Sequence, residues 1–332
     1  MSDASVSRSG TVRVRASRGQ LVAAFAAVYI LWGSTYLGIR FSMETLPAFT
    51  TQGVRFIVAG IVMYAWALAK GQASPTRSQW IGSAVTGALL FLCGTGAVIW
   101  AERVLPSGVA ALLVATEPMA FVLLEAMRRR KAPAPMIFVG LALGSLGLLV
   151  LTGPAALFGG GAFDVRPALL LVAATFCWAG GSLFSRGSRL PKEPIMATAA
   201  TLLCGGALLA ILGIARGEIG AFDPSAVSAK SVIATVYLFI FGSIVGFTAY
   251  LWLLRATTVS RASTYAYVNP IVAVFLGWAL ADEPLNRRVF IASAVIVSAV
   301  ALIIRHGGED LDSVSPQEPD LACPEAPERV RA

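Results

Sequence analysis

Charged residues are scarce in this chain. Of its 332 residues, only 13% are Asp, Glu, Lys or Arg, whereas 57% are hydrophobic. In soluble domains about a quarter of the residues are charged. The composition therefore excludes an ordinary soluble domain and predicts an integral membrane protein. The net charge of +8 comes from basic residues in short loops and one tail, so it bears on membrane orientation and does not indicate nucleic-acid binding.

Histidine and cysteine, which supply many catalytic and metal sites, are almost missing. The one histidine, His306, follows the last apolar run. Cys93, Cys177 and Cys204 lie inside apolar runs, and Cys323 lies in a polar tail. These positions form no disulfide framework and no paired metal-ligand spacing. We therefore expect no metal, no cofactor and no histidine-based catalysis, and the sequence offers no cluster of nucleophile and base for a membrane-embedded enzyme.

Ten apolar runs fill most of the chain. Each has roughly 18 to 25 residues, which is enough for a helix to cross about 30 Å of hydrocarbon. Strands of a membrane barrel would instead alternate in segments of about ten residues. The predicted fold is an all-α integral membrane protein with ten transmembrane helices. The runs are 21–39, 49–69, 80–100, 107–127, 136–153, 167–185, 195–214, 231–254, 262–281 and 288–304.

Three polar segments flank or divide these runs. Residues 1–19 are rich in Arg and Ser, and 154–166 form a linker. Residues 306–332 are acidic, rich in proline and poor in apolar residues, so we expect a disordered tail. The first segment resembles a targeting peptide in composition, but a basic cytosolic tail before a first span has the same composition.

Lysine and arginine collect on one side of the predicted membrane. Sixteen lie on the side of the N-terminus, namely Arg8, Arg13, Arg15, Arg18, Lys70, Arg77, Arg128, Arg129, Arg130, Lys131, Arg186, Arg189, Lys192, Arg255, Arg261 and Arg305. Seven lie on the other side, namely Arg40, Arg103, Arg166, Arg216, Lys230, Arg287 and Arg288. Basic loops stay in the cytoplasm. The bias predicts a multi-pass protein of a bacterial inner membrane with both termini cytoplasmic.

The chain contains an internal repeat. Residues 110–127 (AALLVATEPMAFVLLEAM) align with 262–279 (ASTYAYVNPIVAVFLGWA) at an offset of 152, which places Glu117 on Asn269 and Pro118 on Pro270. Trp32–Arg40 (WGSTYLGIR) aligns with 178–186 (WAGGSLFSR) at an offset of 146. We infer two five-helix repeats.

The repeats would cover residues 20–153 and 167–305. Since five is odd, the second repeat must enter the membrane from the opposite side. Inverted repeats are typical of secondary transporters, whose substrate sites lie near the midplane between the halves.

Glu117 lies near the middle of its predicted span, where a bare charge costs several kcal/mol. It should therefore face protein or water, with or without a bound proton. A site for a cation, a proton or a substrate amine is one interpretation, and a structural hydrogen bond to a neighbouring helix is the other. For Asn269 the interhelical hydrogen bond is favoured, although this is compatible with a place in the cavity wall.

Proline removes a backbone donor, so Pro118 and Pro270 predict kinks at matching depths and a hinge between the halves. Membrane helices are in any case richer in proline than soluble ones, which leaves a plain structural role open.

Aromatic residues at helical spacing are candidates for the wall of a substrate cavity. Such rings could stack on an apolar solute or bind a cation, or they could anchor at the membrane interface. The candidates are Trp32, Tyr36, Trp178, Tyr265 and Tyr267.

Three charged residues at or near span ends have simpler explanations. Arg55 is expected to reach the surface or to pair with an acid in the bundle. Glu102 could belong to the mouth of the cavity, but a solvated loop carboxylate is favoured. Glu125 stands three residues before Arg128, which suffices for an ion pair at a helix end.

Three stretches resemble the EamA-type family of the drug/metabolite transporter superfamily: WGSTYLGIRFSMETLPAFTTQGVRF, AERVLPSGVAALLVATEPM and ASTYAYVNPIVAVFLGWALADEPL. The resemblance covers about residues 20–305. It implies ten helices in two inverted repeats, a central cavity and export of small metabolites or drugs. The cavity candidates it implies are Trp32, Glu102, Glu117, Trp178, Tyr265 and Asn269.

One motif departs from the family. Where the first repeat often ends its fourth helix with a Gly-Glu pair, this chain has residues 128–131, RRRK; the second repeat keeps Asp282-Glu283-Pro284.

The leading hypothesis is therefore a secondary active exporter of small organic metabolites, amino acids or drugs in the lipid bilayer, working by alternating access. Proton coupling through Glu117 is part of this hypothesis. The alternatives are a facilitative permease or lipid translocator on the same scaffold and, less favoured, a membrane-embedded enzyme.

Overall fold

The computed structural model describes residues 17–105, 107–130, 135–152, 166–186, 190–257, 262–282 and 287–307. All regular elements in these ranges are helices. The basic tail, the linker and the acidic tail that the sequence predicts lie almost wholly outside them.

The helices follow the apolar runs closely. They are α1 (Arg18–Ser42), α2 (Ala48–Ala69), α3 (Arg77–Gly87), η1 (Ala88–Thr95), α4 (Gly96–Ala101), α5 (Ser107–Val114), α6 (Glu117–Arg129), α7 (Pro135–Thr152), α9 (Arg166–Ser185), α10 (Pro194–Ala215), η2 (Pro224–Ala226), α11 (Ala229–Tyr237), η3 (Leu238–Gly246), α12 (Phe247–Ala256), α14 (Tyr265–Ala281) and α15 (Arg287–Gly307). Six stretches within the described residues are long and apolar enough to cross a membrane: 18–42, 48–69, 77–101, 166–185, 194–215 and 229–256. The other four predicted spans correspond to α5 with α6, α7, α14 and α15, and their crossing of the membrane stays a prediction.

Two of the long stretches change helix type in the middle. η1 joins α3 to α4, and η3 joins α11 to α12, so that a π-helix interrupts each α-helix without ending it. A π-helical stretch widens the turn and moves the following side chains to a new face, and it often marks a functional site. Both π-helices contain glycine at positions that prove to lie against tryptophan rings.

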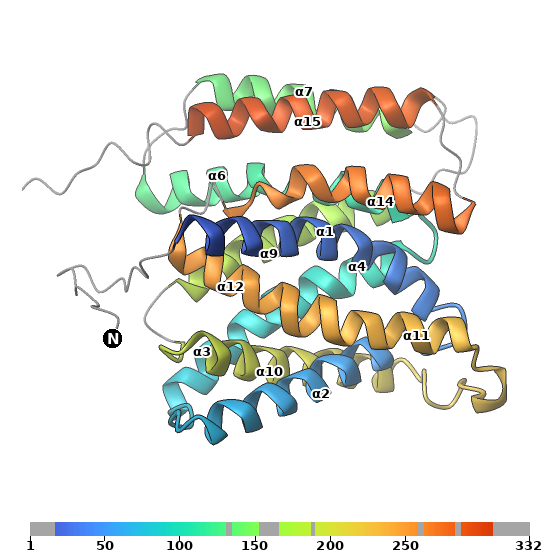
Figure 1. Cartoon of the computed structure of the whole chain (residues 1–332). Coiled ribbons are helices and arrows are strands. Elements are labelled where there is room, and N and C mark those ends of the chain that lie inside the picture. The colour runs from blue at the N-terminus through green and yellow to red at the C-terminus, as the bar shows by residue number, and fades with distance from the viewer. Residues whose placement is uncertain are drawn as a thin grey trace, which may run out of the picture.

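The helices lie side by side with their axes along roughly one direction (Figure 1). α2 packs along α10 at one edge of the bundle, and α7 packs along α15 at the other. Between these pairs, α1 packs against α14 and against α11, η3 and α12, while α9 packs against α6 and against α3, η1 and α4. The elements around α1 and α9 therefore form the centre of the bundle.

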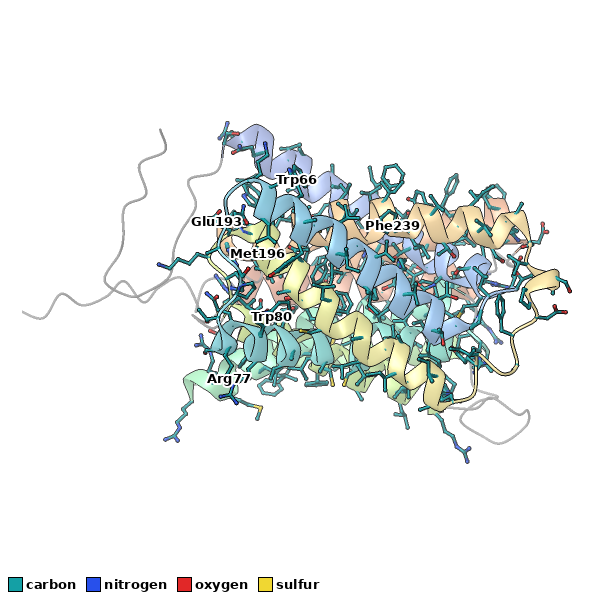
Figure 2. All side chains as sticks on the ribbon, turned by 90° about the horizontal axis from the view of Figure 1, so that it is seen from below. Trp66, Arg77, Trp80, Glu193, Met196 and Phe239 are labelled. Carbon is teal, nitrogen blue, oxygen red and sulfur yellow. The ribbon has the colours of Figure 1, made fainter. Side chains whose placement is uncertain are left out.

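α2 and α10 run in opposite directions. Glu218, just beyond α10, accepts hydrogen bonds from the backbone N–H groups of Phe49 (3.1 Å) and Thr50 (2.8 Å) at the start of α2. Gly53 faces Ala210, and Gly60, seven residues further along α2, faces Leu203, seven residues earlier in α10. Figure 2 shows Trp66, near the end of α2, and Met196, near the start of α10, at the same end of the molecule.

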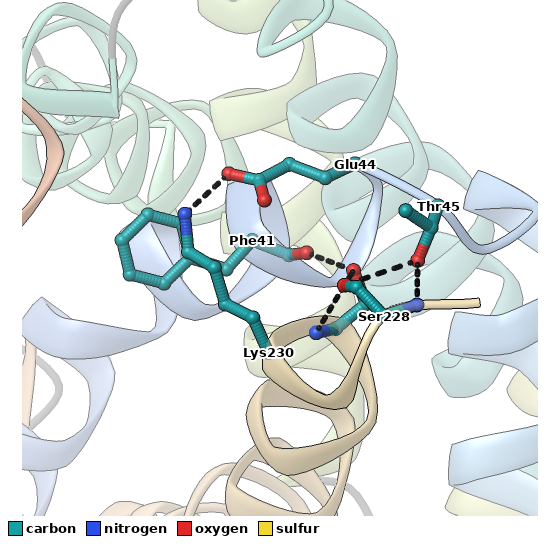
Figure 3. A network of polar contacts seen from close by, with 6 residues as sticks. Phe41, Glu44, Thr45, Ser228 and Lys230 are labelled. Atoms are coloured by element: carbon teal, nitrogen blue, oxygen red, sulfur yellow. Dashed lines mark hydrogen bonds and ion pairs between the residues drawn. The ribbon is translucent and has the colours of Figure 1, made fainter. Parts of the chain in front are cut away.

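Polar contacts fasten the end of α1 to the start of α11 (Figure 3). The Lys230 ammonium lies 2.7 Å from a Glu44 carboxylate oxygen and 3.7 Å from the centre of the Phe41 ring. The backbone N–H of Ser228, which caps α11, donates to the Thr45 hydroxyl at 3.1 Å. These helices therefore also run in opposite directions.

Candidate functional site

A cavity lies in the centre of the bundle, and most of its wall is apolar or aromatic. Ligand pockets in proteins are typically lined in this way, with a few polar groups among the apolar ones. Side chains from α1, α2, η1, α4, α5, α6, α9, η3, α12 and α14 form its wall. The lining residues are Trp32, Thr35, Tyr36, Ile39, Arg55, Phe56, Phe91, Gly94, Thr95, Val98, Val114, Glu117, Ala174, Thr175, Trp178, Gly242, Phe247, Tyr265 and Asn269.

The structure brings together most of the residues that the sequence singled out for binding. Those that line the cavity are Trp32, Tyr36, Glu117, Trp178, Tyr265 and Asn269. The side chain of Tyr267 lies outside the described residues. Substrate binding by the lining residues stays a prediction.

Glu102 is absent from this wall. It caps the C-terminus of α4, and it is only 6% exposed. The expectation of a solvated carboxylate is therefore wrong, because the residue follows directly on a buried helix whose neighbours cover it. Both carboxylate oxygens are buried.

Glu117 is the first residue of α6 and is 1% exposed. α5 ends at Val114, so the predicted fourth span is broken just before the carboxylate. The N-terminus of a helix stabilises a negative charge, and the Tyr265 hydroxyl donates a hydrogen bond to Glu117 Oε1 at 2.6 Å. Glu117 therefore both bonds a neighbouring helix and faces the cavity.

The two aligned prolines differ in local geometry. Pro118 lies in the first turn of α6, where the missing N–H has no partner to lose. Pro270 lies inside α14, which continues from Tyr265 to Ala281. The chain leaves the helical conformation at Ala115 and Thr116, directly before the first proline, whereas α14 continues through the second. Matching kinks at the two positions stay a prediction. A hinge role for either residue stays a prediction.

Asn269 links α14 to α1. In the amide orientation that satisfies its polar atoms, its nitrogen donates to the carbonyl oxygens of Tyr29 (3.0 Å) and Tyr265 (3.1 Å). The hydroxyls of Tyr29 and Thr264, 2.5 Å apart, form a second bond between the same helices. The interhelical hydrogen bond favoured from the sequence is thus present, and the residue lines the cavity as well.

Trp32 is the centre of an aromatic cluster. Its ring lies 4.8 Å from that of Tyr250, and it meets the rings of Trp178 (5.6 Å) and Tyr265 (5.2 Å) edge to face. Its indole N–H donates to the carbonyl oxygen of Gly242 in η3 at 3.3 Å. Trp178 Nε1 donates to the Tyr250 hydroxyl at 3.2 Å. Packing and hydrogen bonds therefore fix both tryptophans.

Each tryptophan lies against a glycine of a π-helix. A Cβ atom on Gly246 would stand 2.5 Å from Trp32 Nε1, and one on Gly94 would stand 2.7 Å from Trp178 Cε3. The two glycines are 152 positions apart, the same offset that aligns Glu117 with Asn269. Each tryptophan thus packs on the glycine from the opposite half of the chain. Isolated glycines in apolar runs were the only sequence signal for this contact.

Arg55 is the charged lining residue that the sequence reasoning did not assign to the cavity. It is 6% exposed, its guanidinium lies 4.2 Å from the centre of the Phe56 ring, and it forms no ion pair with any described residue. Both expectations, a surface side chain and a buried ion pair, are therefore wrong. A single arginine in an apolar run marks an unusual position, but sequence cannot tell which face of the helix it occupies.

The ends of α6 and α14 are alike. Arg130 (φ 54°) and Asp282 (φ 52°) cap them in the left-handed conformation, 152 positions apart. Arg130 thus occupies a backbone conformation that glycine adopts most easily. The expected ion pair at the end of α6 is confirmed, since Arg128 Nη2 lies 2.5 Å from Glu125 Oε1.

Comparison with known proteins identifies the family. The profile of the EamA-like transporter family matches residues 18–153 and again residues 165–305. The chain belongs to the EamA-like transporter family. It is 37% identical over 289 residues to the "Uncharacterized inner membrane transporter YedA" of Escherichia coli K12, covering 85% of this chain and 90% of that protein.

More distant relatives agree with this membership. The "Uncharacterized transporter YetK" of Bacillus subtilis is 25% identical, over 90% of this chain and 91% of its own length. The "WAT1-related protein At3g02690, chloroplastic" of Arabidopsis thaliana is 24% identical, over 85% of this chain and 69% of its own length. A solved crystal structure shares the fold with a TM-score of 0.62 at 23% identity, covering 90% of this chain and all of that one. The predicted family is therefore confirmed, and its members point to transport and not to catalysis.

Proposed function

We propose that this EamA-like protein is a secondary active transporter that exports small organic solutes, such as metabolites, amino acids or drugs, across a bacterial inner membrane by alternating access. The central cavity is the substrate site, and Pro118 and Pro270 contribute to the hinge between the halves. The residues assigned to substrate contact are Trp32, Tyr36, Glu117, Trp178, Tyr265 and Asn269.

The observation that carries the proposal is a cavity whose wall comes from both halves of the chain. Trp32 and Gly94 belong to the first family match, while Trp178 and Gly246 belong to the second, and each tryptophan packs across to the other half. Such a wall must open or close when one half rocks against the other.

Three further observations support an inverted repeat. α2 and its counterpart α10 run in opposite directions. The π-helices η1 and η3 occupy corresponding places in the third and eighth predicted spans. The caps at Arg130 and Asp282 are separated by the repeat offset of 152. These features are expected if two copies of one five-helix unit face each other with opposite orientation in the membrane.

Glu117 is our candidate for the proton-coupling residue. A buried carboxyl group is most easily accommodated with a proton bound, unless donors compensate its charge. The Tyr265 hydroxyl can donate to the ionised form or remain nearby when a proton is bound, so both states have a partner. A substrate or a change of conformation that moves α14 would shift the balance between them.

The test measures flux in liposomes. A growth screen of an overexpressing strain against amino acids, antimetabolites and dyes first supplies the solute. The purified protein is then assayed for flux of that solute with and without a pH gradient. We expect Glu117→Gln to lose the acceleration by the gradient, and Glu125→Gln, on the same helix but outside the cavity, to keep it. If flux through Glu117→Gln is accelerated by the pH gradient as much as in the wild type, then Glu117 does not take part in proton coupling. Transport against a concentration gradient would exclude a facilitative permease.

Orientation has a separate test. A reporter fused within residues 128–131 should be active only in the cytoplasm, as the distribution of basic residues predicts. Activity on the periplasmic side would reverse the assignment of both termini and make the proposed direction of transport untenable.

A further inference from the structure

The cavity wall carries a buried cation that has no anionic partner among the described residues. Arg55 is the only Lys or Arg among the described lining residues, and Glu117 is the only Asp or Glu. No ion pair or hydrogen bond joins them in the described structure, and Glu117 is already bonded to Tyr265. The guanidinium therefore lines the cavity without a carboxylate paired to it among the described residues.

Burial of such a charge is costly. Removing an arginine from water without a partner costs several kcal/mol. The Phe56 ring, 4.2 Å away, offers a cation–π contact that recovers part of this cost. Because a ring covers the face of the guanidinium, its N–H donors in the plane still need acceptors, and Nε has none. A hydrogen-bond acceptor beside this guanidinium would therefore lower the cost of burying it.

The neighbours of Arg55 indicate what else the ligand contacts. A Cβ atom built on Gly242 would lie 3.4 Å from Arg55 Nη1, and the Gly242 carbonyl oxygen accepts the indole N–H of Trp32. Arg55 and Trp32 therefore meet at the same point of η3. Phe56, Phe91 and Phe247 line the same cavity. A ligand whose acceptor group bonds to Arg55 would thus have the rest of its structure surrounded by aromatic rings.

We propose that Arg55 is the anion-binding residue of the cavity, and that the solute is a small organic monocarboxylate whose carboxylate docks on the guanidinium while its apolar or aromatic body lies against Trp32. This rests on the proposed function, because it names the substrate class for the same cavity. Arginine suits the role because its planar fork matches a carboxylate with two parallel hydrogen bonds. The carboxylate of Glu117 in the same wall disfavours solutes with several negative charges.

The test compares three probes with one aromatic body and different charge: phenylacetate, phenylacetamide and phenethylamine. Binding of each radiolabelled probe is measured by equilibrium dialysis with the full-length protein in lipid nanodiscs. We expect the wild type to bind phenylacetate about tenfold or more tightly than the neutral amide, since hydrogen bonds to charged groups are the strong ones. Phenethylamine should bind no more tightly than the amide.

Variants show whether Arg55 causes the preference. Arg55→Gln should weaken phenylacetate binding to the level of the amide and leave amide binding unchanged, which a loss of folding would not do. Arg55→Lys should keep a reduced preference for the anion, because ammonium retains the charge but not the fork. Arg216→Gln is the matched control, because this arginine also lies near a phenylalanine ring, 5.6 Å from Phe49, but outside the cavity wall.

Several outcomes overturn the inference. They are equal affinity of the wild type for the three probes, tighter binding of the amide or the amine, no binding of any probe at millimolar concentration, or a preference that survives in Arg55→Gln. If Arg55→Gln fails to fold, the affinities of the wild type and of Arg55→Lys for the three probes test the inference. Anion binding without flux in liposomes would count against transport alone, and saturable flux confined to neutral or cationic solutes would count against the anion site alone.

Discussion

Adding one methyl group at Gly246 should disturb the centre of the cavity. In Gly246→Ala the new Cβ would stand 2.5 Å from Trp32 Nε1 and 2.8 Å from Cδ1 of the same ring. Carbon atoms in contact are normally about 3.5–4.0 Å apart. Either the indole or the π-helix η3 must therefore move by about 1 Å.

Three rings and a hydrogen bond restrict the indole on every side except the one that faces the cavity. The rings of Trp178, Tyr250 and Tyr265 surround it at 4.8–5.6 Å, and its N–H is bonded to the Gly242 carbonyl oxygen. Overpacking of a full core costs about 1–3 kcal/mol, and the strained hydrogen bond adds about 1 kcal/mol. The expected loss is therefore about 2–4 kcal/mol of unfolding free energy. Gly94→Ala, with a contact of 2.7 Å to Trp178 Cε3, should behave alike.

The assay follows the unfolding of purified protein in mixed micelles as the fraction of denaturing detergent increases. Gly180→Ala is the matched control, because this glycine also lies in a helix, α9, and its new Cβ would come no closer than 3.9 Å to any neighbour, Leu124. We expect the control to retain the stability of the wild type. If Gly246→Ala unfolds at the same detergent fraction as the control, then Trp32 does not pack on η3 as described, and the contact between the halves loses its support.

Two further substitutions test the helix ends. Arg130→Gly should stabilise the protein by about 1 kcal/mol, because the left-handed cap strains any residue with a Cβ. Met127→Gly, in the helical and exposed last turn of α6, should instead destabilise the protein by about 1 kcal/mol. A thermal unfolding series in which Arg130→Gly is less stable than the wild type would contradict the cap geometry. Glu218→Ala should destabilise the α2–α10 pair by about 2 kcal/mol, because it removes three hydrogen bonds at the start of α2. Glu218→Gln should retain part of this energy, and wild-type stability in Glu218→Ala would show that water replaces the carboxylate without loss.

The sequence by itself was sufficient for the class of protein and for six of the nineteen described residues that line the cavity. A bilayer leaves few structures available to a chain that is 57% hydrophobic, so composition predicted a helical membrane protein. The duplication then pointed to Trp32, Trp178, Glu117 and Asn269, because residues at aligned positions of two repeats meet where the halves meet. Those four do line one cavity.

Only the tertiary structure decided the direction in which individual side chains face. A span of about twenty apolar residues has no polar face to orient it, so periodicity could not place Arg55 in the cavity wall or show that Glu102 is buried outside that wall. The same pattern could not reveal that the chain breaks before Pro118 yet continues through Pro270. The contacts of Gly94 and Gly246 with tryptophan rings of the opposite half were equally hidden. Such contacts join residues far apart in the chain, and local propensity carries no information about them.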